Sequence, residues 1–163
     1  MKKFELTNEF ITNMFGTKLF RIRALVEFGD VEAGELGGYV EKESNLGHDD
    51  NAWVYDNAWV YGNARVYGNA WVYGNALVCS DEDYAYAHGF GSVNRTTTFF
   101  RLKDGGVGVR CGCFYGTLAQ FRDKIRETHG ETKKAQEYLM LADLMELRFE
   151  EDENEVGNRK YVE

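Results

Sequence analysis

The chain of 163 residues contains no proline and only three cysteines, Cys79, Cys111 and Cys113. Because proline is absent, the turns must be made by glycine, asparagine and aspartate. An odd number of cysteines without the spacing of a disulfide framework favours a protein that works with reduced thiols. We therefore expect a cytoplasmic protein.

Long apolar runs and an excess of basic charge are also missing. No segment approaches the roughly 18 consecutive apolar residues that a membrane span requires, so we expect no membrane insertion. A net charge of -8 argues against a protein that wraps duplex DNA, because such a protein needs a basic footprint. The charge is uneven: basic residues outnumber acidic ones from 95 to 130, and acidic residues outnumber basic ones from 131 onward.

A six-residue repeat occupies the middle of the chain. Its units begin at Asp50, Asp56, Gly62, Gly68 and Gly74, and the first reads Asp-Asn-Ala-Trp-Val-Tyr. Alanine stands third and valine fifth in every unit, so both face the same side of a short strand. The Gly-Asn or Asp-Asn pair between strands supplies a turn. The repeat predicts a coil with alanine and valine inside and with tryptophan and tyrosine outside.

The repeat resembles that of the hexapeptide-repeat left-handed β-helix superfamily, in which three units make one triangular coil. Val40 and Leu46 extend the inward register upstream, which gives about seven units. The resemblance implies a mainly β fold with C-terminal α structure, built on a short left-handed parallel β-helix. A little over two coils need caps, because open coil ends are exposed sheet edges.

Segments on both sides of the repeat look like those of short hexapeptide-repeat proteins of bacteria and their phages. They include Leu-Phe-Arg-Ile-Arg-Ala-Leu at 19–25, Thr-Thr-Phe-Phe at 97–100, Cys-Gly-Cys-Phe at 111–114 and Thr-His-Gly at 128–130. This resemblance implies a phage or prophage accessory protein, in the host cell cytoplasm if phage-encoded. Small proteins of that kind commonly inhibit host immunity, either by docking on a defence protein or by sequestering a nucleotide signal.

The flanking sequences predict the caps. Residues 15–28 alternate as a strand, with Phe20, Ile22 and Ala24 on one face. Residues 96–103 and 107–113 predict a hairpin that turns at Asp-Gly-Gly. We therefore divide the chain into an N-terminal cap, the repeat, a hairpin with two helices, and an acidic tail, at residues 1–37, 38–93, 94–149 and 150–163.

Two helices are predicted after the hairpin. Thr117 and Gln120 have the spacing of a capping box, and the apolar stripe that follows stops at His129-Gly130. The stripe consists of Leu118, Phe121 and Ile125. A second helix is expected from about Thr132 to Phe149.

Acyl transfer is the activity that the family resemblance implies, with a histidine as general base. His88, just past the last repeat, is the candidate for this role. However, the coil is too short to offer a long groove for the pantetheine arm of coenzyme A, and a fold does not imply a function. We expect that the protein is not an enzyme. An acyl-coenzyme A dependent acyltransferase and a self-assembling structural module are the alternatives.

A metal site from Cys111, Cys113 and His129 is a weaker candidate. Structural zinc prefers four ligands at wider pair spacing, and no fourth ligand is evident. Cysteine is also an ordinary buried residue. We expect these cysteines to pack beneath the C-terminal helix, with no metal and no cofactor.

The aromatic residues of the repeat form an array that should face outward. With three units per coil, Trp53 would stack over Trp71 and Tyr55 over Tyr73, with Trp59 on another face. So much aromatic area is costly to leave in water, so something must cover it. The flanks and symmetry mates of a homo-oligomer, with a trimer favoured, are one cover, and a partner protein is the other.

Arginines on the flanking strands form a second candidate binding set: Arg21, Arg23, Arg95, Arg101 and Arg110. Guanidinium groups suit phosphate or carboxylate oxygens and stack on bases. If the strands cap the coil, these arginines could converge on an anion pocket lined by aromatic residues and by the hydroxyls of Thr96, Thr97 and Thr98. The alternative is solvated strand faces paired with acids. We therefore expect a binding protein whose partner is a host protein or a small anionic nucleotide.

Overall fold

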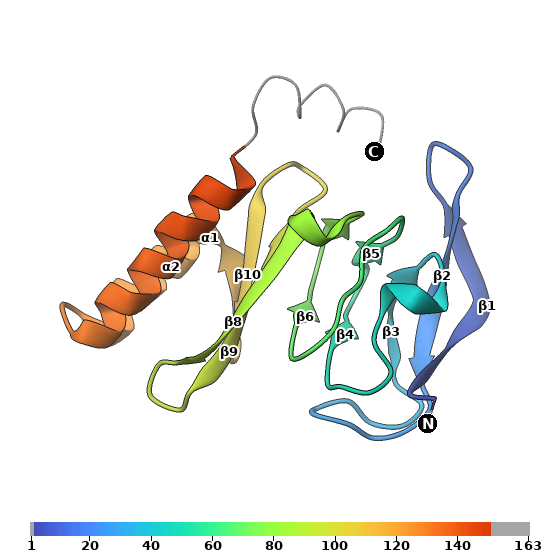
Figure 1. Ribbon diagram of the computed structural model, residues 1–163, viewed down its shortest axis with the longest axis horizontal. Coiled ribbons are helices and arrows are strands. Elements are labelled where there is room, and N and C mark those ends of the chain that lie inside the picture. Colours follow the sequence, from blue (N-terminus) through green and yellow to red (C-terminus); the bar gives the residue numbers. More distant parts are fainter. Residues whose placement is uncertain (1, 151–163) are drawn as a thin grey trace.

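The chain folds into a mainly β structure with two C-terminal helices, which a computed structural model describes for residues 2–150 (Figure 1). The predicted acidic tail lies outside the described residues, apart from Glu150. The elements are β1 (Phe4–Thr12), β2 (Lys18–Ala24), β3 (Leu36–Val40), η1 (Glu43–Asn45), β4 (Trp53–Val54), β5 (Trp59–Val60), β6 (Trp71–Val72), β7 (Leu77–Val78), η2 (Asp81–Asp83), β8 (Tyr84–Phe90), β9 (Arg95–Arg101), β10 (Val107–Cys111), β11 (Phe114–Thr117), α1 (Leu118–His129) and α2 (Lys133–Phe149).

The strands form three separate sheets, so the prediction of a left-handed parallel β-helix is wrong. One sheet has the order β1-β2-β3-β5-β7 and is mixed, a second is the parallel pair β4-β6, and the third is antiparallel with the order β11-β10-β9-β8. Each repeat strand is only two residues long, and the unit at Gly62 forms a single bridge, Leu46 to Val66. Such short ladders do not build a continuous parallel solenoid, and the sheet through β3 continues into the antiparallel hairpin β1-β2.

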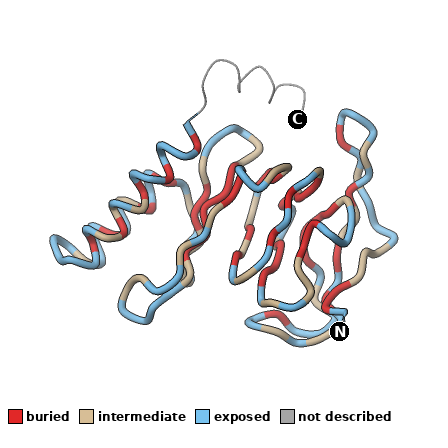
Figure 2. Tube along the Cα trace, viewed as in Figure 1, coloured by how far each residue is buried: buried red, intermediate tan, exposed pale blue. Residues whose placement is uncertain are grey.

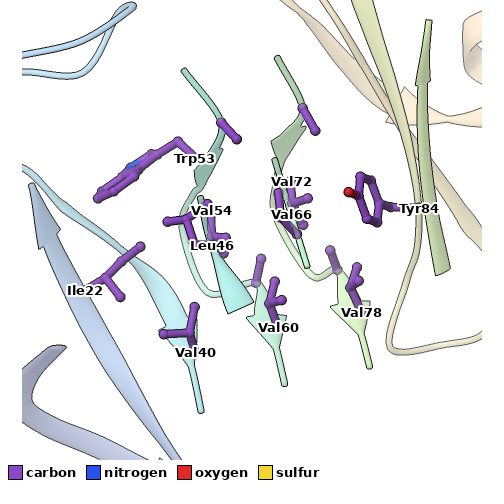
Figure 3. Close-up of a cluster of buried hydrophobic side chains, with 14 of the residues drawn as sticks. Ile22, Val40, Leu46, Trp53, Val54, Val60, Val66, Val72, Val78 and Tyr84 are labelled. Atoms are coloured by element: carbon purple, nitrogen blue, oxygen red, sulfur yellow. The ribbon is translucent and has the colours of Figure 1, made fainter. Parts of the chain in front are cut away.

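The interior of the repeat is as predicted. Every alanine and valine of the five units is at most 1% exposed. Their side chains form one continuous apolar column, drawn in Figure 3, with Ile22 and Trp53 at one end and Tyr84 at the other. The turn prediction is also confirmed, because Asp56, Gly62 and Gly68 have left-handed backbone conformations with φ of 53°, 64° and 72°.

The two ends of the repeat are covered by different structures. The β1-β2 hairpin packs on one end through Phe4 and Ile22, and the antiparallel sheet packs on the other through Tyr84 and Phe100. β8, which lies in the predicted repeat segment 38–93, pairs with β9 of this sheet. Figure 2 shows the buried residues running through the repeat into β8 and β9. Both ends of the apolar column are therefore closed within one chain.

The helices pack on the antiparallel sheet, on the face away from the repeat (Figure 1). The predicted capping box is confirmed, because the Thr117 hydroxyl accepts from the Gln120 amide and the Gln120 side chain accepts from the Thr117 amide. α1 ends at Gly130, with φ of 59°, and its stripe Leu118, Phe121 and Ile125 is buried. Thr132 caps α2. In the part of the chain described here, neither helix is long and apolar enough to cross a membrane.

A buried ion pair joins the repeat, the sheet and α2. Asp83 is fully buried and accepts the backbone N–H groups of Cys79 and Ser80 at 3.0 and 3.2 Å. Its other carboxylate oxygen accepts from Arg101 Nε at 3.4 Å. Arg101, 4% exposed, also donates to the carbonyl of Phe149 at 3.3 Å. The charges therefore hold three segments together that are distant in sequence.

Replacing Asp83 with alanine should destabilise the protein strongly, because it removes a fully buried carboxylate that pairs with Arg101 and accepts two backbone N–H groups. We expect a loss of about 3–5 kcal/mol in the free energy of unfolding. Glu5→Ala, which breaks the exposed pair with Arg23, should cost less than about 1 kcal/mol. Urea denaturation of both variants measures the difference, and equal losses would show that the buried pair has no special role.

Candidate anion-binding cleft

A cleft of about 450 Å³ lies between the repeat and the antiparallel sheet. The sheet contributes His88, Arg95, Thr96 and Arg110, and the repeat contributes Trp71. Asn51 and Asn69 from the repeat turns, Gly29 and Asp30 from the loop after β2, and Gly112 and Cys113 from the β10–β11 turn complete the lining. Its volume is within the range of about 300–1,000 Å³ that small-molecule sites occupy.

Strand alternation decides which side chains from Thr96 to Arg101 of β9 face the repeat and the cleft. Side chains of successive strand residues point to opposite faces. Phe100 packs with the repeat, Thr98 accepts the Trp71 amide N–H at 3.0 Å, and Thr96 lines the cleft, so these three share one face. Thr97 and Phe99 point to the helices. The hydroxyl that the cleft uses is therefore that of Thr96.

Arg110 is the central cation of the cleft. It lies opposite Thr98 in the register of β9 and β10. Its guanidinium carbon is 4.3 Å from the centroid of the Tyr73 ring and 5.8 Å from that of Trp71. Within residues 2–150 its side chain makes no hydrogen bond or ion pair, and its Nε is buried without a partner. The rings thus hold a guanidinium in place while its donors stay unused.

Arg95 and His88 occupy the outer part of the cleft. The His88 Nδ1 lies 2.7 Å from the Thr96 hydroxyl, to which it pairs across β8 and β9. Arg95 is exposed and also makes no hydrogen bond or ion pair among the described residues. With Arg110 it gives the cleft two cations against the single carboxylate of Asp30, so the lining is net positive.

Two of the predicted binding arginines lie elsewhere, on the N-terminal hairpin. Arg21 forms an ion pair with Glu9 and donates to the Gly37 carbonyl at 2.7 Å and to the Tyr39 hydroxyl at 2.6 Å. Arg23 forms an ion pair with Glu5. Both are paired within the hairpin and its neighbouring strand, so they do not converge with Arg95 and Arg110.

Arg101 and Thr97 also turn away from the cleft. Arg101 is held by Asp83 and Phe149, and the Thr97 hydroxyl is buried and donates to Cys111 Sγ at 3.2 Å. Thr97 and Arg101 are odd-numbered residues of β9, and strand alternation places both side chains on the helix side of the sheet. The predicted convergence of arginines is therefore wrong for Arg21, Arg23 and Arg101.

The aromatic array is largely covered by the chain itself. Trp53 and Trp71 pair in register, and the Tyr55 and Tyr73 rings stack with centroids 4.0 Å apart, as the repeat predicts. Trp53 is fully buried, however, beneath the rings of Phe4 and Phe28. The described flanks cover much of this area, so the expected homo-oligomer stays a prediction without the support of bare aromatic faces.

The cover over the other two tryptophans comes from basic side chains. Lys103 Nζ lies 4.1 Å from the centroid of the Trp59 ring. Trp71 is half-buried against Arg110 and Tyr55 and lines the cleft. Trp71 is thus the one of the three repeat tryptophans that a ligand in the cleft would touch.

Several cleft residues were not selected from the sequence. Asn51 and Asn69 stand second in their repeat units, and the repeat signal explains them only as turn residues. Their 18-residue separation, which stacks equivalent positions, could have placed them side by side. Asp30 carried no signal, because it comes from a loop that reaches the cleft only in three dimensions.

Cys111, Cys113 and His129 do not form a metal centre in the structure: no group of three or more metal-ligating side chains occurs among residues 2–150. Cys111 lies beneath α2, where its Sγ is 3.8 Å from the Tyr138 hydroxyl. Cys113 is exposed at the cleft.

Burial raises the pKa of Tyr55 above its ordinary value, and the adjacent Tyr73 hydroxyl adds to the effect. Burial also raises the pKa of Tyr73, although Arg110 opposes this. The stacked pair is therefore neutral at physiological pH, so the Tyr73 ring that packs against Arg110 carries no negative charge.

Comparison of the chain with protein-family models gives no match, and comparison with curated proteins gives no similar sequence. Neither comparison supports the family resemblance, which the three-sheet architecture contradicts.

The raised pKa of Tyr55 predicts how stability depends on pH. The group deprotonates near pH 10 in the unfolded chain and at higher pH in the folded one, so stability is complete below pH 10 and falls above it. Tyr55→Phe should reduce this fall by up to about 1.4 kcal/mol per pH unit. Urea denaturation of the wild type and of Tyr55→Phe between pH 8 and 11 tests this. If the free energies of unfolding of the two proteins fall in parallel above pH 10, the prediction is wrong.

Proposed function

We propose that the protein is a non-enzymatic binding protein that takes up a small anionic ligand with a planar ring, of the nucleotide class, in the cleft beside Arg110. The observation that carries the proposal is the Arg110 guanidinium, held against Tyr73 and Trp71 with its hydrogen-bonding groups unused in the described chain. Arginine on an aromatic floor is suited both to phosphate oxygens and to a stacked base.

The other residues of the cleft support the same ligand class. Arg95 adds a second cation, and Thr96 and His88 offer polar groups next to it. Trp71 supplies a ring face, and Asn51 and Asn69 supply amides that can read the edge of a base. A ligand with phosphate and base together uses all of these groups, whereas an inorganic anion would leave Trp71 and the amides without a role.

A small ligand is better supported than a protein partner. The expectation of protein docking rested on outward tryptophans, and Trp53 is buried while Trp59 is covered by Lys103. The expectation of a phage origin and of action against host immunity rested on the family resemblance, which finds no support. The proposal therefore rests on the cleft alone.

An acyltransferase is the alternative that uses His88 as general base. His88 lies in the cleft, but the only described hydrogen-bond partner of its ring is Thr96. Nothing in the cleft singles out an acyl donor, so binding without turnover is preferred. Chromatography of the ligand released on heating distinguishes the two, because a binding protein returns it unchanged.

Arg110→Ala should weaken nucleotide binding by about ten- to a hundredfold, the loss of a charge-assisted hydrogen bond of about 1.5–3 kcal/mol. Arg110→Lys keeps the charge without the planar fork and should lose less affinity.

Thermal-shift screening of AMP, ADP-ribose, coenzyme A and cyclic dinucleotides finds the ligand, since a ligand at 100 times its Kd adds about 2.7 kcal/mol of stability. Calorimetry then compares the variants with Arg23→Ala, whose arginine is paired with Glu5 away from the cleft. No stabilisation by any nucleotide, or equal losses in Arg110→Ala and Arg23→Ala, would refute the proposal.

Trp71 should report binding by its fluorescence, because it is the repeat tryptophan that lines the cleft. Titration with the bound nucleotide should change the emission of the wild-type protein. The change should be lost in Trp71→Phe and kept in Trp59→Phe. A signal that persists in Trp71→Phe would place the ligand elsewhere.

A further inference from the structure

A second, smaller cavity lies directly beside the cleft. It has a volume of about 230 Å³ and is bounded by the β10–β11 turn and by the two helices. Arg95 and Cys113 line both the cleft and this cavity. The cavity is smaller than the roughly 300 Å³ at which independent small-molecule sites begin, so it suits part of a ligand that continues into the cleft.

The walls of this cavity are aromatic. The rings of Phe121 and Tyr138 meet at 90° with centroids 5.7 Å apart, and Phe114 lies against Phe121 at 5.9 Å. His129 stacks on Tyr138 with centroids 5.9 Å apart. Ile125 adds an aliphatic surface. This lining favours a flat ring, because aromatic side chains pack against rings by stacking and by edge contacts.

The Tyr138 hydroxyl is a polar group in the cavity that can orient such a ring. Burial raises the pKa of Tyr138, so its hydroxyl stays protonated and is available as a hydrogen-bond donor. Its described contacts are with the side chains of Cys111 and Thr97. The Cys111 thiol is a weak hydrogen-bonding partner. A ring nitrogen or carbonyl of a ligand can take its place beside the Tyr138 hydroxyl.

Two glycines make room for Arg95 at the boundary and for the Tyr138 hydroxyl in the cavity. At Gly112, with φ of 58°, a side-chain carbon would collide with the Arg95 guanidinium. At Gly91, with φ of 82°, it would collide with the Tyr138 hydroxyl. Arg95 thus lies across the backbone of the β10–β11 turn, between the two spaces, and it influences the ionisation of Tyr138.

We infer that the ligand is a dinucleotide, with one ring on Trp71 in the cleft, its phosphates at Arg95, and its second ring in the aromatic cavity. The inference rests on the proposed function and adds the class of nucleotide. A mononucleotide fills the cleft and leaves the aromatic cavity unused. Phosphate groups at the boundary match the one cation that both spaces share.

Calorimetry with cyclic di-AMP, NAD⁺ and AMP tests the inference on the full chain. At least one of the two dinucleotides should bind at least tenfold more tightly than AMP. Thr128→Trp places an indole at an exposed position that lines the cavity, and should weaken dinucleotide binding at least tenfold while AMP binding changes less than twofold. Gln136→Trp, at an exposed and uncharged position on α2 outside the cavity lining, is the matched control and should bind as the wild type does.

Tyr138→Phe is a second variant that keeps the ring and removes only the hydroxyl. It should weaken dinucleotide binding by threefold or more and leave AMP binding unchanged. If AMP binds as tightly as the dinucleotides and neither Thr128→Trp nor Tyr138→Phe changes any affinity, the dinucleotide inference is wrong and the cleft proposal stands. If none of the three nucleotides binds and the broader nucleotide screen is also negative, the proposed function fails and the inference fails with it.

Discussion

The buried ion pair of Asp83 and Arg101 is the interaction on which the arrangement of the molecule depends. One oxygen of Asp83 accepts two amides at the end of the repeat, and the other accepts from an arginine of β9 that also reaches the last carbonyl of α2. Desolvating two charges is costly, and the pair is tolerated because further hydrogen bonds satisfy both partners. The sheet is thereby fixed against the repeat, and the cleft lies between these two fixed bodies.

The same strands of the antiparallel sheet make hydrophobic contacts on both faces of the sheet. Phe100 of β9 closes the apolar column of the repeat, and its neighbour Phe99 belongs to the core beneath the helices. Farther along β9 the repeat no longer covers the strand, and Thr96 and Arg95 line the cleft instead. A strand with hydrophobic contacts on both faces is a rigid support, and this rigidity keeps the cleft residues in place without a ligand.

Local patterns predicted the parts of the fold whose contacts are close in sequence. The capping box at Thr117, the end of α1 at Gly130, the hairpin between β9 and β10, and the burial of every repeat alanine and valine are all confirmed. The β-helix was wrong because the repeat pattern defines which side chains face inward but not how far the ladders extend. Two-residue strands make weak ladders, and the sheet that contains β3, β5 and β7 is completed by the distant hairpin β1-β2 instead.

The repeat is enough to specify an apolar column of alanine and valine, with turns of glycine, asparagine and aspartate, because a fixed period repeats the same local preference. The sequence also supplied Trp71, Arg95 and Arg110 as candidates on the basis of their chemistry. Which candidates meet depends on the tertiary structure. Arg101 and Thr97 point toward the helices, and Arg21 and Arg23 are paired on the hairpin. Thr96, His88 and Asp30 enter the cleft instead. Such a choice depends on strand register and on packing between segments far apart in the chain, and neither is encoded in any single stretch of residues.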